Sequence, residues 1–347
     1  MIFLIRFVTS LCLYTFIGNA NIWLNPLNNI LLVFGSRFFL VLSPLFSKIF
    51  CRYAITSALL IASTGAALLC FNKNLYTILA ILFLGVGISV SGYLIRSEAA
   101  ETISGAANNK IAINAGSLIA GIILLFTLSQ DIFFIIVTVI LLIITLLSWI
   151  RNKRDTNIKL PIVQKVSKRR WFGWSFLGIT IGIKLYSVFS VLPQYIILHS
   201  GKLPSWYGIL VFINSGIIIL LQKPIMNIVS KFQKDHKALK FTLLVVFLGM
   251  FLISFPNCFN VTAFGGAFAW ILMLSIIECI VSYLDVQGAR DGCLFIKELS
   301  IGLGGGICVL FTRCFPPEFS GISLGLFGII SIIIAVMLLY DDFKIST

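Results

Sequence analysis

Long apolar segments recur along almost the whole chain and constrain its fold more than any other feature. A helix that spans the hydrocarbon core of a bilayer needs about 20 apolar residues. Twelve segments approach or exceed this length; they lie near residues 2–18, 27–46, 54–71, 75–95, 111–128, 132–150, 171–198, 206–226, 238–255, 263–284, 293–312 and 320–340. With 59% hydrophobic residues, the chain has too little polar surface to cover a water-soluble globule. The sequence predicts an all-α polytopic membrane protein with twelve transmembrane helices.

The first segment has the length of a signal peptide, but its charge lies in the wrong place for one. A signal peptide has a basic start and a small-residue cleavage site. Here Arg6 lies inside the apolar run. We therefore expect residues 2–18 to form a short or N-terminally clipped first helix.

The longest polar run, residues 151–170, divides these segments into two sets of six. It carries eight Lys or Arg residues against the single Asp155. We predict three parts: an N-terminal six-helix half at 1–150, a basic cytosolic central loop at 151–170, and a C-terminal six-helix half at 171–347.

Basic residues also predict the orientation. If the N-terminus is cytosolic, twenty of the 26 Lys and Arg residues fall in inside loops and only Lys73, Lys202 and Arg313 in outside loops. Basic loops resist translocation, so both termini are expected in the cytoplasm, with the protein in a plasma membrane or bacterial inner membrane. The basic residues behind the net charge of +14 therefore set the orientation in the membrane, and nucleic acid is not expected as a partner.

Two pairs of segments indicate that the halves repeat one another. Residues 31–50 and 210–232 each contain Val-Phe, then a Pro near the inner end, then Ser-Lys. VSGYL at 90–94 is echoed by VSYLD at 281–285. Six plus six helices, a basic central loop, parallel repeats and two inside termini resemble the major facilitator superfamily of secondary transporters. This resemblance implies alternating access around a site near the membrane midplane.

The motifs of that family are only partly present. Its loop between helices 2 and 3 usually reads Gly-x-Leu-x-Asp-Arg-x-Gly-Arg-Arg, and SPLFSKIFCRY at 43–53 stands in its place. Lys48 and Arg52 keep the basic character of this gating loop, while Ser47 replaces the Asp. The export signature Gly-x-x-x-Gly-Pro-x-x-Gly-Gly is reduced to Gly116 and Gly121 without a Pro, so it does not indicate an export direction.

Ionisable residues inside apolar segments are the main candidates for function, because hydrocarbon tolerates them only beside a partner or a cavity. Arg37, Lys184 and Glu278 lie well inside such segments. The resemblance places Lys184 and Glu278 on helices 7 and 10, which line the central cavity in that family, where they could neutralise each other. Arg6 is expected to extend to the inner headgroups. Three positive charges and one negative charge favour an anionic or zwitterionic solute.

Neutral polar residues provide further candidates. Asn214 and Tyr186 could touch a solute, as could Gln222, Asn114, Trp174 and Trp270, although single amides more often join helix to helix. Glycines at 85, 87 and 92, and at 302 and 304–306, predict faces where helices approach closely.

A membrane enzyme is the main alternative class. DVQGARDG at 285–292 resembles part of the CDP-alcohol phosphotransferase signature but lacks its second Asp at the required spacing and its downstream Asp residues. Two His residues in loops and eight dispersed Cys residues predict neither a metal site nor a disulfide framework. We expect no enzymatic activity, cofactor or metal.

The sequence therefore predicts a monomeric secondary active transporter that moves a small solute, coupled to protons. Within transport, the alternative is a lipid or lysolipid translocator of the same fold. Outside transport, it is a sensor or scaffold. The identity of the solute and the direction of transport stay open.

The basic asymmetry predicts a labelling pattern. In a variant without its native cysteines, a cysteine replacing Lys202 should react with a membrane-impermeant thiol reagent added to sealed cells, because the loop lies outside. A cysteine replacing Arg169 should react only after the membrane is permeabilised. Labelling of the Arg169 position in intact cells would contradict the orientation.

Overall fold

The computed structural model describes residues 1–23, 28, 32, 37–70, 74–123, 129–154, 166–202, 204, 206–231 and 237–339. Within these residues the chain is helical and contains no strand, which confirms the all-α class. Residues 27, 29–31 and 33–36 of the second predicted segment, at 27–46, and the middle of the basic run, at 155–165, lie outside the described residues. The number twelve therefore stays a prediction.

The helices follow the apolar segments, with some shifted ends. They are α1 (Ile2–Trp23), α3 (Ser43–Phe50), α4 (Ala54–Leu69), α5 (Asn74–Ala99), α6 (Ile103–Ile123), α7 (Gln130–Arg154), α8 (Lys168–Ser200), α9 (Trp206–Lys231), α10 (Lys237–Ser254), α11 (Phe264–Val281), α12 (Tyr283–Arg290), α13 (Leu294–Cys314) and α14 (Pro317–Leu339). Short 3-10 turns occur at Phe39–Leu42 (η1), Cys51–Tyr53 (η2) and Pro256–Phe259 (η4).

Eight of the described helical stretches are long and apolar enough to cross a membrane, and α1 and α10 contain shorter apolar helices. Large apolar side chains are exposed along them. On α7 these include Ile135, Val139 and Leu142, with exposed fractions between 46% and 54%. Such a face is unfavourable in water and favourable against lipid, so the chain is an integral membrane protein.

The chain forms two compact units. Unit 1 comprises Met1–Ala99 and Asn108–Ile162, and unit 2 comprises Ala100–Ala107 and Val163–Thr347. In unit 1, α4 packs along α5 and α7. Gly65 permits the close approach of α4 to α5, because a Cβ at that position would lie 2.7 Å from the Ala80 carbonyl oxygen.

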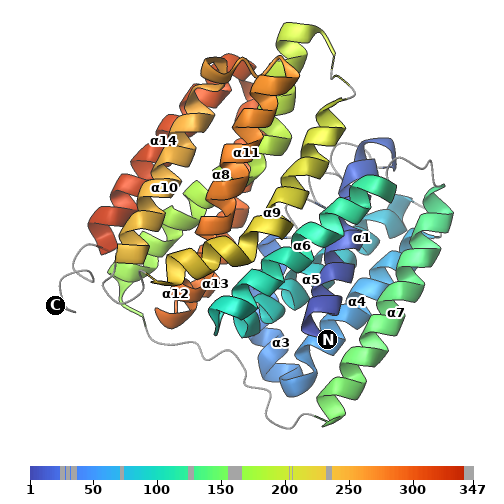
Figure 1. Ribbon diagram of the computed structural model, residues 1–347. Coiled ribbons are helices and arrows are strands. Elements are labelled where there is room, and N and C mark those ends of the chain that lie inside the picture. The colour runs from blue at the N-terminus through green and yellow to red at the C-terminus, as the bar shows by residue number, and fades with distance from the viewer. Residues whose placement is uncertain are drawn as a thin grey trace. The chain divides into compact units, whose positions relative to one another are not determined.

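In unit 2, α8 packs along α13 and α14 (Figure 1). Gly178 and Gly182 of α8 and Gly304 of α13 leave no room for a side chain between the two backbones. The close approach predicted for the glycine-rich stretch at 302–306 is confirmed, since a Cβ on Gly304 would lie 2.8 Å from the Ile179 carbonyl carbon. We call this contact the α8–α13 seam.

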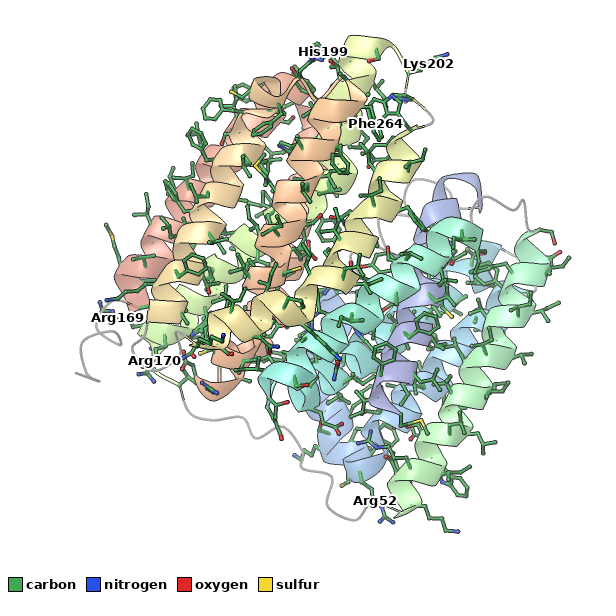
Figure 2. The ribbon with its side chains drawn as sticks, in the orientation of Figure 1. Arg52, Arg169, Arg170, His199, Lys202 and Phe264 are labelled. Carbon is green, nitrogen blue, oxygen red and sulfur yellow. The ribbon has the colours of Figure 1, made fainter. Side chains whose placement is uncertain are left out.

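The two ends of α8 differ in charge. Ser167 caps its N-terminus by accepting a hydrogen bond from the Arg170 backbone N–H, and Gly201 ends it in a left-handed conformation with φ of 72°. Figure 2 shows Arg169 and Arg170 at one end of unit 2 and His199 and Lys202 at the other. Ser167 and Gly201 thus fix a helix of 33 residues, about 50 Å long, with basic residues concentrated at its start.

The α8–α13 seam predicts that a Gly-to-Ala substitution within it destabilises the protein more than one at an open glycine. Gly304→Ala should lower the free energy of unfolding by about 1–3 kcal/mol, because the added methyl group meets backbone atoms that cannot rotate away. Gly208→Ala on α9 is the matched control, since no heavy atom lies within 4 Å of its Cβ position. Thermal unfolding of the detergent-purified variants measures both effects, and equal midpoints would contradict the close packing.

Candidate functional site

Lys184 and Glu278 meet inside unit 2. The Lys184 Nζ lies 3.2 Å from the Glu278 Oε2, and their side chains are 1% and 13% exposed. Lys184 belongs to α8 and Glu278 to α11. Gly249 of α10 lies beside the aliphatic part of Lys184, since a Cβ there would be in ordinary van der Waals contact with the Lys184 Cγ at 3.9 Å. The structure therefore brings together the two charges that the sequence placed on separate helices.

Polar contacts between α9 and α11 fix the face that α11 presents. The Ser275 hydroxyl donates a hydrogen bond to the Asn214 Oδ1 at 2.6 Å, and the Gln222 Nε2 donates one to the Cys279 carbonyl at 3.2 Å. Asn214 and Gln222 are buried. Both amides therefore join helix to helix, and they hold α11 in the rotation that directs Glu278 to Lys184.

Other neutral candidates also have structural contacts. The Tyr186 ring packs against Gly305, where no Cβ would fit. Both indoles donate hydrogen bonds, from the Trp174 Nε1 to the Asp291 carboxylate at 3.2 Å and from the Trp270 Nε1 to the Leu252 carbonyl at 3.0 Å. The Asn114 amide bonds its own helix at the Lys110 carbonyl.

Arg37 and Arg6 belong to unit 1. Arg37 is half-buried, and its carbonyl accepts a hydrogen bond from the Ser89 hydroxyl at 3.3 Å. Arg6 requires a correction, because it is only 8% exposed and does not extend to the headgroups. Its guanidinium lies against α5 at Gly92, the residue type that leaves room for it. The predicted small-residue face of α5 thus accommodates a charged side chain.

The gating loop is helical, which also corrects the prediction. Residues 43–53 form α3 and η2, and Cys51, with φ of 48°, makes the turn between them. Pro44 starts α3 because a Pro in the first helical turn has no N–H that needs a partner. Ser47 is buried and Lys48 is exposed. The Arg52 guanidinium lies 4.9 Å from the centre of the Tyr53 ring.

Sequence reasoning missed a second group of buried charges in unit 2. Lys297, one of the twenty basic residues expected in inside loops, lies in the first turn of α13 and is 1% exposed. Its Nζ contacts the Asp285 Oδ1 and lies 3.0 Å from the Glu298 Oε1. We call Asp285, Lys297 and Glu298 the Lys297 cluster. The signal for it was the adjacent charged residues Lys297 and Glu298 near the start of an apolar segment.

Comparison with known proteins identifies the fold through solved structures and not through the sequence. No protein-family model matches the sequence, and no curated protein sequence matches it. Solved structures do match: the human organic anion transporter MFSD10 (TETRAN) superposes with a TM-score of 0.68 at 11% identity, over 96% of this chain and 97% of the other. The chain has the major facilitator fold.

Two further structures support this fold. A POT family transporter in complex with 5-aminolevulinic acid gives a TM-score of 0.68 at 14% identity, covering 99% of this chain and 96% of the other. The POT family transporter PepTSo gives 0.62 at 14% identity, covering 100% and 98%. All three structures therefore agree on the fold of this chain.

The Lys184–Glu278 pair predicts a non-additive mutational effect. Lys184→Met should lower the free energy of unfolding by about 3–5 kcal/mol, because it leaves a buried carboxylate without its ammonium. Adding Glu278→Gln should restore most of this loss. The control is Arg151→Met, whose partner Glu98 is 34% exposed and whose loss should cost about 1 kcal/mol or less. Additive effects of the two substitutions in thermal unfolding would contradict a direct pair.

Proposed function

We propose that this protein is a secondary active transporter that carries a small anionic or zwitterionic solute across the membrane by alternating access, coupled to protons. The observation that supports this best is the buried Lys184–Glu278 pair, which lies within apolar helices of a chain with the major facilitator fold. A buried ion pair adds little net stability, so its presence within apolar helices favours a functional role. The sequence contains no ATP-binding motif, so a gradient supplies the energy.

The pair can exchange a proton for a substrate charge. A proton bound to Glu278 neutralises the carboxylate and weakens its attraction for the Lys184 ammonium. The buried Lys184 ammonium is then uncompensated. Pairing with a carboxylate or phosphate of the solute restores a counter-charge and is therefore favourable. When the solute leaves, the ammonium returns to Glu278 and the proton is released. One lysine is thus shared between an internal acid and an external anion.

Other residues have proposed supporting roles. Tyr186 lies on α8 two residues after Lys184, and Asn214 is joined to α11 one turn before Glu278. Tyr186, through its position on α8, and Asn214, through its contact with α11, would respond when the pair opens. We assign Arg37 a role in anion binding, and Ser47, Lys48 and Arg52 a role in the cytosolic gate.

The proposed topology follows from charge. The halves 1–150 and 171–347 would alternate around the site, joined by the cytosolic segment 151–170, with both termini in the cytoplasm. The buried charges of Lys184 on α8 and Glu278 on α11 favour a transporter over a scaffold. Burying an ion pair in an apolar environment is costly, and a scaffold has no function that requires it.

Substitution of Glu278 provides the test. A thermal-shift screen of small organic acids and amino acids would first identify a solute that stabilises the purified protein. In proteoliposomes, Glu278→Gln should abolish accumulation of that radiolabelled solute driven by a pH gradient, yet retain exchange against unlabelled solute, which needs no net proton movement. Glu98→Gln, in the partly exposed pair of unit 1, is the control and should retain both activities.

The outcomes separate the alternatives. Accumulation by Glu278→Gln at the wild-type rate would remove proton coupling from this residue. Movement of a labelled lysolipid, with none of the organic acids or amino acids transported, would favour a lipid translocator. Absence of any flux by the wild-type protein would favour a sensor.

A further inference from the structure

Buried hydroxyl and amide groups hold together the end of unit 1 that contains η2. The Thr56 hydroxyl of α4 lies 2.9 Å from the Ser148 hydroxyl of α7, and it accepts a hydrogen bond of 2.9 Å from the Asn152 Nδ2. η2 directly precedes α4 and also packs against α7. The turn of η2 and the last turns of α7 are therefore fixed beside each other.

Two exposed cations flank this contact, and each lies over an aromatic ring. The Arg52 guanidinium lies 4.9 Å from the centre of the Tyr53 ring, and the Lys153 Nζ lies 5.7 Å from the centre of the Trp149 ring. Both cations are within four residues of the hydroxyl and amide groups that join α4 to α7. Figure 2 shows Arg52 at this end of unit 1. Attraction between a cation and a ring face restrains where each charge lies. We call these four residues the Arg52–Lys153 surface.

This surface continues an apolar face of unit 1. Trp149 and Leu146 are exposed side by side on α7. On α3, Leu45 and Ile49 are exposed, and the exposed Lys48 shares their side of the helix. Aromatic rings and long basic side chains at the edge of an apolar face are typical of the level where hydrocarbon meets lipid headgroups. The cations of the surface therefore lie at headgroup level.

The sequence around these cations contains few acids. Residues 37–97 and residues 132–154 contain no Asp or Glu. Glu98, which follows the first stretch, forms a 2.6 Å ion pair with Arg151. Asp155, which follows the second, lies outside the described residues. The described part of this surface therefore carries an excess of positive charge.

We propose that Arg52 and Lys153 bind the phosphate of an anionic phospholipid, whose acyl chains contact the exposed face of α7 beside Trp149. An anionic headgroup complements the charge of the surface, whereas a zwitterionic headgroup carries a cation of its own. The Arg52 guanidinium can donate two hydrogen bonds to phosphate oxygens, and the Lys153 ammonium adds a second charge. Arg52 also belongs to the proposed gate, so an effect of the lipid on gating rests on the proposed function, but binding of the lipid does not.

Quenching of Trp149 fluorescence tests this proposal without a transported solute. The full-length protein is reconstituted in phosphatidylcholine vesicles that contain a fixed fraction of lipid with brominated acyl chains, either phosphatidylglycerol or phosphatidylcholine. The difference between the protein and its Trp149→Phe variant isolates the Trp149 signal. Brominated phosphatidylglycerol should quench this signal more strongly. Its relative binding constant should be roughly 25-fold higher, because each basic residue near the membrane surface contributes about fivefold.

Substitution of the cations distinguishes this site from general surface charge. Arg52→Gln with Lys153→Gln should make the two brominated lipids quench Trp149 about equally. Arg52→Lys with Lys153→Arg keeps both charges and should retain most of the preference. The matched control, Lys168→Gln with Lys223→Gln, removes the same charge from exposed positions in unit 2 and should retain all of it.

Three results would overturn the proposal. They are equal quenching by the two lipids in the wild type, an unchanged preference in Arg52→Gln with Lys153→Gln, and an equal loss of preference in the unit 2 control. Because no solute crosses the membrane in this assay, its failure is separable from failure of the proposed function.

Discussion

The ion pair between Lys184 and Glu278 sets the demands that the rest of unit 2 meets. A charge within hydrocarbon is costly unless a partner is held in place, and here the partners stand on different helices, α8 and α11. The helices must therefore be fixed in rotation as well as in position. Two hydrogen bonds between α9 and α11, one accepted by Asn214 and one donated by Gln222, fix α11, and the glycines of α8 and α13 fix α8.

The α8–α13 seam shows how such fixation arises without a hydrophobic driving force between helices. Lipid chains are as apolar as leucine, so helices associate through close van der Waals contact and interhelical hydrogen bonds. Gly182 and Gly304 supply the first, and the pair of hydroxyls at Ser175 and Ser300 supplies the second. Both ionic groups of unit 2 lie along this seam or beside it. A shift of α8 would therefore change both.

The candidate site was only partly predictable from sequence. Lys184 and Glu278 stand out because each interrupts an apolar run. The Lys297 cluster was missed because Asp285, Lys297 and Glu298 lie at segment ends, where charges usually face water. Arg6 was misjudged for the same reason, since a residue near a helix start can extend to water or pack against a glycine such as Gly92.

The sequence by itself determined the all-α membrane class and most helix positions, because apolar length and periodicity are local properties that every span must carry. It did not determine which charges meet. A helix can rotate about its axis without any change in its sequence, and only contacts such as Asn214 with Ser275 choose one rotation. The helical form of residues 43–53 and the burial of Lys297 were likewise decided by tertiary packing, because whether a polar residue is buried depends on what the other helices place beside it.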